Sequence, residues 1–427
     1  MSESFKTRTA FIMASVGSAV GLGNIFRFPA LAVKYGLAFI IVYTILLFTI
    51  GIPMLSAELA VGRKFSMSAV GSARKILKKA EFAGWLAAAN SFVIASYYCV
   101  LFSMVLLCAV FSYRLYDMSV DGMLVFKDIL YTSQLRIEVV LGLVAAWAAV
   151  YLCFGRAEKL GIISTVSVIF AVVVIFLLAV WRGLSSSDQL NSFLRFDVGV
   201  LYSRGFWGDV SGQVFFSLSV AVGAMISYGA FLHKKENIAV CGVIIGVCDL
   251  AVSIFATVIY ATVPKTDTEG GLLTCFSVYP EAFMQLGGGL VSAIVSFLFY
   301  LSLALLCLDS VIAYLKSITH CLEDRFSVLQ ERSAVKVIGL AAFLGFFMLG
   351  AQGSVVLAFA DGIVAKFLTL SVALIEMIIF GYVLGTGTIA EEMGIKNRGA
   401  VERGFAFSIK IFAPAVLAFL FLREFIF

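Results

Sequence analysis

The sequence predicts an all-α integral membrane protein with about eleven transmembrane helices. Hydrophobic residues make up 62% of its 427 residues and charged residues only 13%, a balance that excludes a soluble globular domain. Apolar runs of roughly the 20 residues that a helix needs to cross a bilayer recur along the chain. The basic residues behind the net charge of +5 gather in short segments between these runs, which indicates membrane topology and not nucleic-acid binding.

The apolar runs assign the expected spans in order. They cover about residues 9–33, 37–61, 82–112, 136–154, 160–181, 208–232, 238–263, 290–322, 335–349, 354–384 and 405–421. The basic segment 63–79 follows the second span and predicts the cytoplasmic side, which places the N-terminus inside. An odd number of spans then places the C-terminus outside. We expect the protein in the cytoplasmic membrane, with the lipid bilayer around it.

The spans are expected to form a single transmembrane domain over residues 1–427. The first and sixth spans are both interrupted by glycine and hydroxyl residues, and they lie five spans apart. A pair of broken helices in corresponding halves indicates inverted repeats with a binding site near the bilayer midplane. The expected repeats are about 9–181 and 208–384, followed by an extra C-terminal helix at about 405–421.

The interruption of the first span is the strongest local signal. Gly17, Gly21 and Gly23 fall within seven residues and are followed by Asn24. Each glycine in a helix interior costs about 1 kcal/mol relative to alanine. An open backbone in hydrocarbon is tolerable only where it lines a polar cavity, where its carbonyls can hold a cation and its amides a carboxylate. On this segment alone, a glycine-rich helix-packing face explains the pattern equally well.

Carboxylates within the spans point to cations. Asp249 and Asp309 lie inside spans seven and eight, and each costs roughly 2.5–3.5 kcal/mol to insert. No Lys or Arg shares the span of Asp249, whereas Lys316 lies two turns from Asp309. With hydroxyls nearby, these carboxylates fit a hard cation such as sodium, and a proton remains open as well. Two further acids, Glu58 and Glu376, are interpreted as structural or interfacial.

The segment Gly17-Ser18-Ala19-Val20-Gly21-Leu22-Gly23-Asn24-Ile25-Phe26-Arg27-Phe28-Pro29 resembles the first-helix signature of the neurotransmitter:sodium symporter family. Four further segments agree in order and spacing: Gly51-Ile52-Pro53 with Glu58 and Gly62-Arg63, Ser96-Tyr97-Tyr98, Gly212-Gln213-Val214-Phe215-Phe216-Ser217-Leu218-Ser219, and Leu308-Asp309-Ser310. The resemblance covers nearly the whole chain. It is similar to the bacterial amino-acid transporter branch of that family, with a leucine-transporter-like fold.

The resemblance implies site residues at matching positions. Sodium site one is implied at the Ala19 carbonyl, Asn24, Ser217 and Asp249, and site two at the carbonyls of Gly17, Val20 and Leu306 with Asp309 and Ser310. The substrate carboxylate would meet Leu22, Gly23 and Tyr98; the ammonium would meet carbonyls around Ala19, Phe216 and Ser219; the walls would be Ile94, Val222, Ser310 and Tyr314. Arg27, Gln213 and Asp361 are implied as the outer gate and Asp324 as an inner gate.

Further implications concern specificity. Amine-transporting members carry an Asp where this chain has Gly21, so an amino acid is favoured, and Val222 and Tyr314 suggest a hydrophobic or aromatic side chain. Asp249 stands where chloride-dependent members have Asn, so chloride should not be required. The family's Arg and Trp before the first span are replaced by Ser2 and Phe5, which leaves Lys6 to pair with Asp324.

The sequence thus predicts sodium-coupled symport of an amino acid by alternating access. Two alternatives stay open: a sodium-dependent amino-acid sensor that does not transport, and a proton-coupled transporter that uses Asp249 or Asp309. An intramembrane enzyme finds little support. The chain has no His-Glu-x-x-His or Gly-x-Ser-x-Gly motif, and its only histidines, His233 and His320, fall at inner ends of spans.

Overall fold

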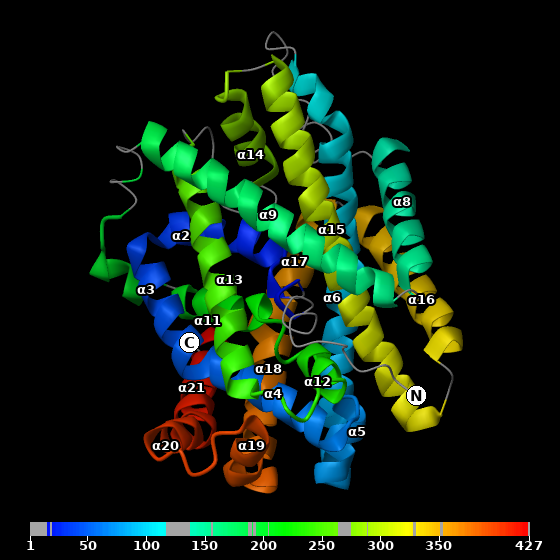
Figure 1. Cartoon of the computed structure of the whole chain (residues 1–427), viewed down its shortest axis with the longest axis vertical. Coiled ribbons are helices and arrows are strands. Elements are labelled where there is room, and N and C mark those ends of the chain that lie inside the picture. The colour runs from blue at the N-terminus through cyan, green and yellow to red at the C-terminus, as the bar shows by residue number, and fades with distance from the viewer. Residues whose placement is uncertain are drawn as a thin grey trace.

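The computed structural model describes residues 15–425, apart from 18, 117–136, 155–156, 187–189, 191–193, 204, 264–274, 288, 328–329 and 351–352. These described residues form helices and short connections, with no strand among them. Figure 1 shows most helices running along the long axis of the molecule, with α5 and α12 at one end and α14 at the other. The prediction of an all-helical fold is confirmed.

The described helices have the following bounds. They are α2 (Phe28–Tyr35), α3 (Leu37–Leu46), α4 (Ile52–Phe65), α5 (Ala69–Ile76), α6 (Glu81–Phe111), α8 (Ile137–Phe154), α9 (Ala157–Ser185), α11 (Phe206–Ser217), α12 (Ala224–Ala230), α13 (Ile238–Ala261), α14 (Cys275–Met284), α15 (Gly289–Phe326), α16 (Gln330–Gly350), α17 (Gly353–Ile363), α18 (Thr369–Ile378), α19 (Thr386–Met393), α20 (Ala400–Phe407) and α21 (Ala413–Phe425). Wider π-helical turns lie at Gly23–Arg27, Leu47–Gly51, Val364–Leu368, Ile379–Gly385 and Ser408–Phe412.

Eight helical stretches in the described part of the chain are long and apolar enough to cross a membrane. The expected spans outside this set are the first and sixth, which are broken, and the ninth, whose apolar part covers only Ser333–Met348. A length criterion fails at a broken helix, because each half is shorter than the bilayer. The count of eleven therefore stays a prediction.

The basic segment 63–79, which the sequence suggested to be a loop between spans, is mostly helical, so the expectation of a loop there is wrong. α5 occupies Ala69–Ile76, and the Ser68 side chain accepts a hydrogen bond from the Gly71 amide at its N-terminus. Serine is a strong N-cap, and basic Arg74 and Lys75 in the last turn complement the helix dipole. The cap and the charge placement favour a short helix here.

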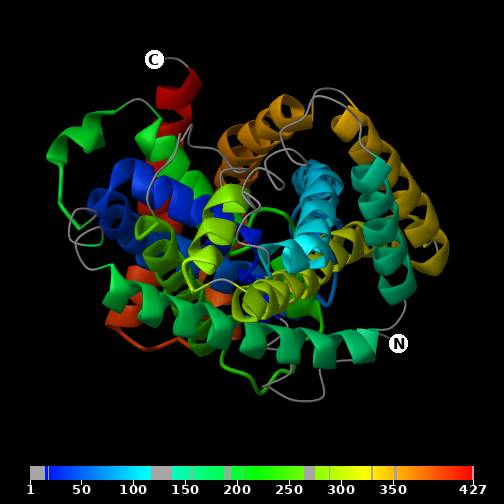
Figure 2. The ribbon, with the colours of Figure 1, turned by 90° about the horizontal axis from the view of Figure 1, so that it is seen from above.

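Close helix contacts depend on glycine. Gly84 of α6 faces the backbone of α5, where an added Cβ would lie 2.5 Å from the Val70 Cα. On α4, Gly62 faces the backbone of Ile226 in α12, and Gly229 of α12 faces the backbone of Leu59. Small residues let helix backbones approach in a membrane, where packing drives association. Viewed from above, α8 and α16 lie at one side of the bundle and α2 and α3 at the other (Figure 2).

Both expected helix breaks are present. In the first span, helical residues 15–17 are separated from the helix that starts near Leu22 by a bend at Val20 and Gly21. In the sixth span, α11 ends at Ser217 and α12 starts at Ala224, so residues 218–223 are unwound. The prediction of broken first and sixth helices is confirmed, whereas the limits of the two repeats stay a prediction.

Candidate functional site

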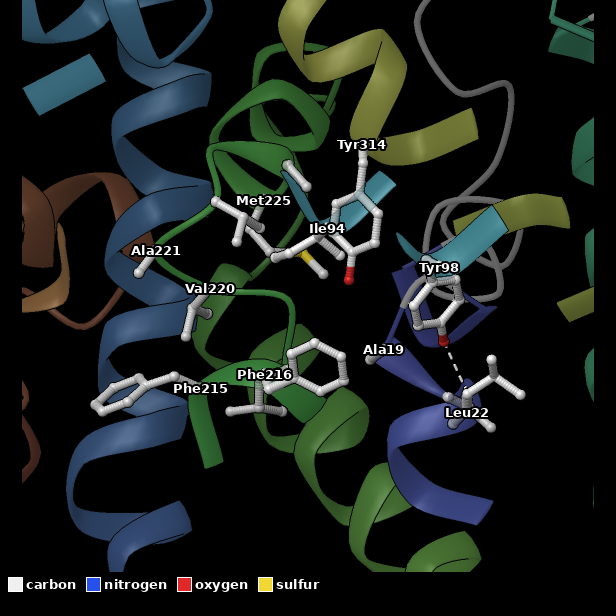
Figure 3. Close-up of a cluster of buried hydrophobic side chains, with 14 of the residues drawn as sticks. Ala19, Leu22, Ile94, Tyr98, Phe215, Phe216, Val220, Ala221, Met225 and Tyr314 are labelled. Atoms are coloured by element: carbon white, nitrogen blue, oxygen red, sulfur yellow. Dashed lines mark hydrogen bonds between the residues drawn. The ribbon is translucent and has the colours of Figure 1, made fainter. Parts of the chain in front are cut away.

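The break in the first span presents backbone amides to side chains from elsewhere in the fold. The Leu22 amide donates to the Tyr98 hydroxyl of α6 at 2.8 Å (Figure 3). The Gly21 amide donates to Oδ1 of Asn24, three residues along the chain, at 3.0 Å. A Cβ on Gly21 would lie 2.6 Å from the Tyr98 oxygen and 3.3 Å from the Ser310 hydroxyl. Only glycine therefore lets α6 and α15 approach this break so closely.

The break in the sixth span has a strained backbone. Ser219 and Ala221 have φ values of 52° and 60°, in the left-handed region that non-glycine residues rarely adopt, and Gly223 follows at 71°. Each such non-glycine residue costs on the order of 1–2 kcal/mol unless its surroundings hold it. The unwound segment must therefore be fixed by contacts from other helices.

Side chains of α4, α6 and α15 supply those contacts. Glu58 accepts from the Ala221 amide at 2.7 Å, and Asn90 donates to the Ala221 carbonyl at 3.2 Å. Ser91 donates to the Val222 carbonyl at 2.5 Å, and Tyr314 lies 3.4 Å from the Ser219 hydroxyl. We call Glu58, Asn90 and Ser91 the clamp of the sixth helix.

A polar cluster joins the two breaks. Asp249 of α13 is fully buried, and its carboxylate accepts from Asn24 at 2.7 Å and from Ser217 at 2.6 Å. Its second oxygen accepts from the Tyr43 hydroxyl at 2.8 Å. Asn24 belongs to the first broken helix and Ser217 ends α11, so the cluster ties both breaks to α13.

This cluster is rich in oxygen. The Asn24 side-chain nitrogen lies within 3.2 Å of four oxygens: the Ser217 and Ser253 hydroxyls and the carbonyl and carboxylate of Asp249. A primary amide has two hydrogens, so it cannot satisfy four acceptors. A buried carboxylate with surplus oxygen acceptors is a suitable environment for a hard monovalent cation.

The other implied cation ligands come from the first helix and α15. Gly17, Ala19 and Val20 are buried around the break, and Leu306 and Ser310 are buried on α15. Ser310 donates to the Leu306 carbonyl at 3.1 Å, and its hydroxyl lies beside Gly21. Asp309 is half-buried one residue before it. The structure thus brings α15 against the first break.

Aromatic and aliphatic side chains gather around the breaks. In Figure 3, Phe216, Tyr314, Tyr98 and Ala19 surround a common centre, with the Tyr314 hydroxyl directed toward the Phe216 ring. The Tyr98 and Tyr314 rings meet edge to face at 6.1 Å, and Tyr98 lies 6.5 Å from Phe216. Ile94, Val222 and Ser219, the other implied wall or ammonium residues, are also buried.

An ion pair lies next to the same region. Arg27 lies 3.3 Å from Asp361 and donates to Gln213 at 3.1 Å, and Gln213 donates to the Gly23 carbonyl at 3.0 Å. The Arg27 guanidinium also lies 5.5 Å above the Phe216 ring. The three residues implied as an outer gate therefore form one connected network.

The comparisons with known proteins agree with this architecture. A sequence profile of the "Sodium:neurotransmitter symporter family" matches residues 2–118 and 109–427. The chain belongs to this family. The resemblance found in the first-helix motif is thus confirmed, and the family is one of sodium-dependent membrane symporters, not of enzymes.

Individual relatives are distant. An uncharacterized sodium-dependent transporter of Methanocaldococcus jannaschii is 27% identical over 421 residues, covering 92% of this chain and 84% of that protein. The sodium- and chloride-dependent GABA transporter 2 of Mus musculus is 25% identical over 485 residues, covering 98% and 79%. The crystal structure of MhsT in complex with L-phenylalanine has a TM-score of 0.91, with 22% identity and full coverage of both chains. That structure shows that the symporter shares the fold of MhsT.

Asp324, the residue implied as an inner gate, lies against the start of α5. Asp324 accepts from the Ser68 amide at 2.6 Å and lies 3.9 Å from His320, so it contacts the start of α5. Lys6, its proposed partner, lies outside the described residues, as do Ser2, Phe5 and Ser18. Arg63 pairs with Glu392 at 2.7 Å and joins α4 to α19.

Sequence reasoning missed several residues that hold the site. Tyr43 and Tyr97 bind Asp249 and Asp361 through their hydroxyls, at 2.8 Å and 3.3 Å. Asn90 and Glu58 belong to the clamp, and the full burial of Glu58 agrees with the structural rather than the interfacial interpretation of this residue. An Asn and a Glu inside apolar runs were visible signals, but nothing in the sequence indicated their backbone partner. In the described residues no group of three His, Cys, Asp or Glu side chains could hold a metal ion.

Proposed function

We propose that this symporter carries a hydrophobic or aromatic amino acid across the cytoplasmic membrane with sodium, by alternating access. The observation that carries the proposal is the meeting of the two helix breaks: the Leu22 amide and Tyr98 hydroxyl lie on one side, and the Asn24–Ser217–Asp249 cluster lies on the other. Amide and hydroxyl hydrogens suit a carboxylate, and the oxygen cluster suits sodium.

Sodium is proposed at two sites. The first uses the Ala19 carbonyl, Asn24, Ser217 and Asp249, and the second uses the carbonyls of Gly17, Val20 and Leu306 with Asp309 and Ser310. The burial of Asp249 and the surplus of acceptors around Asn24 support the first site. A substrate carboxylate beside Gly21 would bring a negative charge near this sodium, so each ligand would strengthen the binding of the other.

Substrate selection follows from the same contacts. Gly21 leaves no room for a side chain beside Tyr98, so no carboxylate from this position can pair with an amine substrate. The α-carboxylate is then the group that the Leu22 amide and Tyr98 hydroxyl recognise. Phe216, Tyr314, Ile94 and Val222 offer apolar surface to the rest of the substrate.

Chloride is not expected to be required. The Asp249 carboxylate already supplies a buried negative charge to the hydroxyls of Tyr43 and Ser217. A chloride ion bound here would be repelled by the nearby carboxylate of Asp249. The mouse relative is named as chloride-dependent, so this chain would differ from it in ion requirement.

The orientation is proposed from the basic residues. Arg74 and Lys75 of α5 lie at the end of the molecule opposite α14 (Figure 1). Basic segments stay on the cytoplasmic side, so this end would face the cytoplasm and the Arg27–Asp361 pair would face outward. With that pair formed, the structure would be closed to the outside.

Uptake into liposomes tests the proposal. Purified protein is reconstituted, and uptake of radiolabelled phenylalanine, leucine, alanine and glutamate is measured with an inward sodium gradient and with potassium in its place. We expect sodium-driven uptake of phenylalanine or leucine, unchanged when gluconate replaces chloride. Sodium-dependent binding without uptake would support a sensor instead. Uptake driven by a proton gradient in the absence of sodium would overturn sodium coupling.

A further inference from the structure

Basic residues gather at the corner where the chain turns from α5 into α6. Arg74 and Lys75 lie in the last turn of α5, and Lys78 and Lys79 lie in the short turn that leads into α6. All four side chains are exposed. We call Lys75, Lys78 and Lys79 the lysine corner. It adjoins α5, which lies at the end of the molecule opposite α14 (Figure 1).

The lysine corner lies at the boundary of a membrane span. The apolar helical stretch that contains α6 begins at Lys78 and ends at Arg114, and it is long enough to cross a bilayer. Lysines at the end of such a span keep their aliphatic stems along apolar surface and their ammonium groups among the lipid headgroups. Trp85, one turn into α6, is a residue type enriched at the same boundary. The three ammonium groups are therefore placed at headgroup level.

The arginines near this corner are paired, whereas its lysines are not. Arg325 of α15 lies 2.6 Å from the Glu81 carboxylate, and Arg74 lies 3.8 Å from the same group. Among the residues that the structure describes, no carboxylate pairs with any lysine of the corner. Positive charge that the protein does not compensate attracts anionic headgroups at a membrane surface. The lysine corner therefore has the charge to bind an anion from outside the chain.

Exposed apolar side chains adjoin the lysine corner. Leu77, Phe82 and Phe326 are 45%, 58% and 57% exposed. The Phe326 ring lies 5.9 Å from the Trp85 ring, so the end of α15 borders the same surface as the start of α6. A soluble anion would leave these apolar side chains in water, whereas a lipid would cover them. The surface thus fits a ligand that has both an anionic head and an apolar tail.

One face of α6 offers a path for the tail. Phe82, Leu86, Ala89 and Val93 recur at helical spacing, and each is exposed or half-buried. Farther along, residues 94–105 are all buried, so the open face covers only about three turns next to the lysine corner. We propose that the lysine corner binds the headgroup of an anionic phospholipid, whose acyl chain lies along this open face of α6.

A lipid bound here would support the sixth helix through α5. An added Cβ on Gly223, the residue before α12, would lie 3.0 Å from the Cβ of Ala69 in α5. The Ser68 amide, at the start of α5, donates to Asp324 of α15 at 2.6 Å. α5 therefore packs against both α15 and the inner half of the sixth span. A ligand that binds the folded protein stabilises it by mass action, so the anionic lipid should stabilise this packing.

Native mass spectrometry of the purified protein tests the lipid site. The protein is incubated in detergent with equal concentrations of phosphatidylglycerol and phosphatidylethanolamine that carry the same acyl chains. The wild type should retain severalfold more phosphatidylglycerol, and the double variant Lys78→Gln/Lys79→Gln should lose most of this preference. The matched control is Lys234→Gln/Lys235→Gln, an exposed lysine pair that also precedes a membrane span. It should keep the preference, because the preference belongs to the lysine corner.

Two results would overturn the proposal. An equal loss of preference in both double variants would mean that the lipid responds to overall charge and not to the lysine corner. Displacement of phosphatidylglycerol by an equal concentration of glycerol phosphate, which has the head without the tail, would make a soluble anion the occupant.

Thermal unfolding in detergent reports the support that the lipid gives to α5. Phosphatidylglycerol should raise the unfolding midpoint of the wild type by several degrees and that of Lys78→Gln/Lys79→Gln by much less. An equal rise in both proteins would contradict binding at the lysine corner. None of these measurements needs a substrate or sodium, so failure of this proposal is distinguishable from failure of the proposed transport function.

Discussion

The two helix breaks reach similar shapes by different means. The first break uses glycine at its tightest point, and Gly21 meets the Tyr98 hydroxyl where no side chain fits. The sixth break places Ser219 and Ala221 in left-handed conformations, and only Gly223 is a glycine there. The first break is thus encoded by its own residues, whereas the sixth is imposed by Glu58, Asn90 and Ser91 from α4 and α6. A broken helix can therefore be specified by its own residues or by the helices packed against it.

The largest effect is expected where the two breaks meet. Asp249→Asn keeps the shape of the side chain but removes the buried charge that Asn24 and Ser217 contact. Sodium affinity should fall by on the order of tenfold or more, which is about 1.4 kcal/mol or more, because the cation loses a carboxylate ligand. Sodium titrations of substrate binding in chloride and in gluconate measure this, and chloride should partly restore binding. If the sodium dependence and the chloride dependence of substrate binding both match the wild type, Asp249 has no part in the sodium site.

The first break should be sensitive to a single methyl group. In Gly21→Ala the Cβ would lie 2.6 Å from the Tyr98 oxygen, so Tyr98 must move away from the Leu22 amide. Substrate affinity should fall by roughly tenfold, with a smaller effect on thermal stability. Gly183→Ala in α9, where only Val258 lies nearby, is the matched control and should bind normally. Equal substrate affinities in the two variants would mean that the Leu22 amide and the Tyr98 hydroxyl do not bind the substrate carboxylate.

The sixth break should depend on its clamp. Asn90→Ala removes hydrogen bonds to the Ala221 carbonyl and to Thr369, and it leaves a buried carbonyl without that partner. We expect a loss of about 1–3 kcal/mol in stability, seen as a lower midpoint of thermal unfolding in detergent. Thr369→Val removes only one of these bonds, so its loss should be smaller. A larger loss in Thr369→Val would mean that α18, not the unwound segment, depends on Asn90.

The smallest effect is expected from relieving strain. Ala221 has a φ of 60°, so Ala221→Gly removes a penalty of about 1–2 kcal/mol at the cost of some backbone entropy. The net result should be a stability gain below about 1 kcal/mol, measured by thermal unfolding. Ala251→Gly within α13 provides the comparison, because a helical alanine should lose stability when replaced. A loss of stability in Ala221→Gly would show that the segment is not strained.

The contrast between local and long-range determinants also explains which features of the fold and the site could be predicted from the sequence. Long apolar runs predicted the helices, and the glycines of the first span predicted its break, because both signals are local. The α5 helix was missed since its cap at Ser68 lies in a segment dominated by basic residues. The clamp was missed because Glu58 and Asn90 lie 163 and 131 residues from Ala221, and no local pattern encodes such a distance. Tyr43, in the apolar second span, gave no sign that it binds Asp249.

The central claim is that the two breaks together form a sodium-dependent amino-acid site. Equilibrium binding of the common amino acids to the purified protein, in sodium and with potassium in its place, tests it most directly. We predict that hydrophobic or aromatic amino acids bind in sodium and lose most of their affinity in potassium, because the cation at Asp249 neutralises the charge that faces the substrate carboxylate. Binding that is equally tight in both salts would contradict the account.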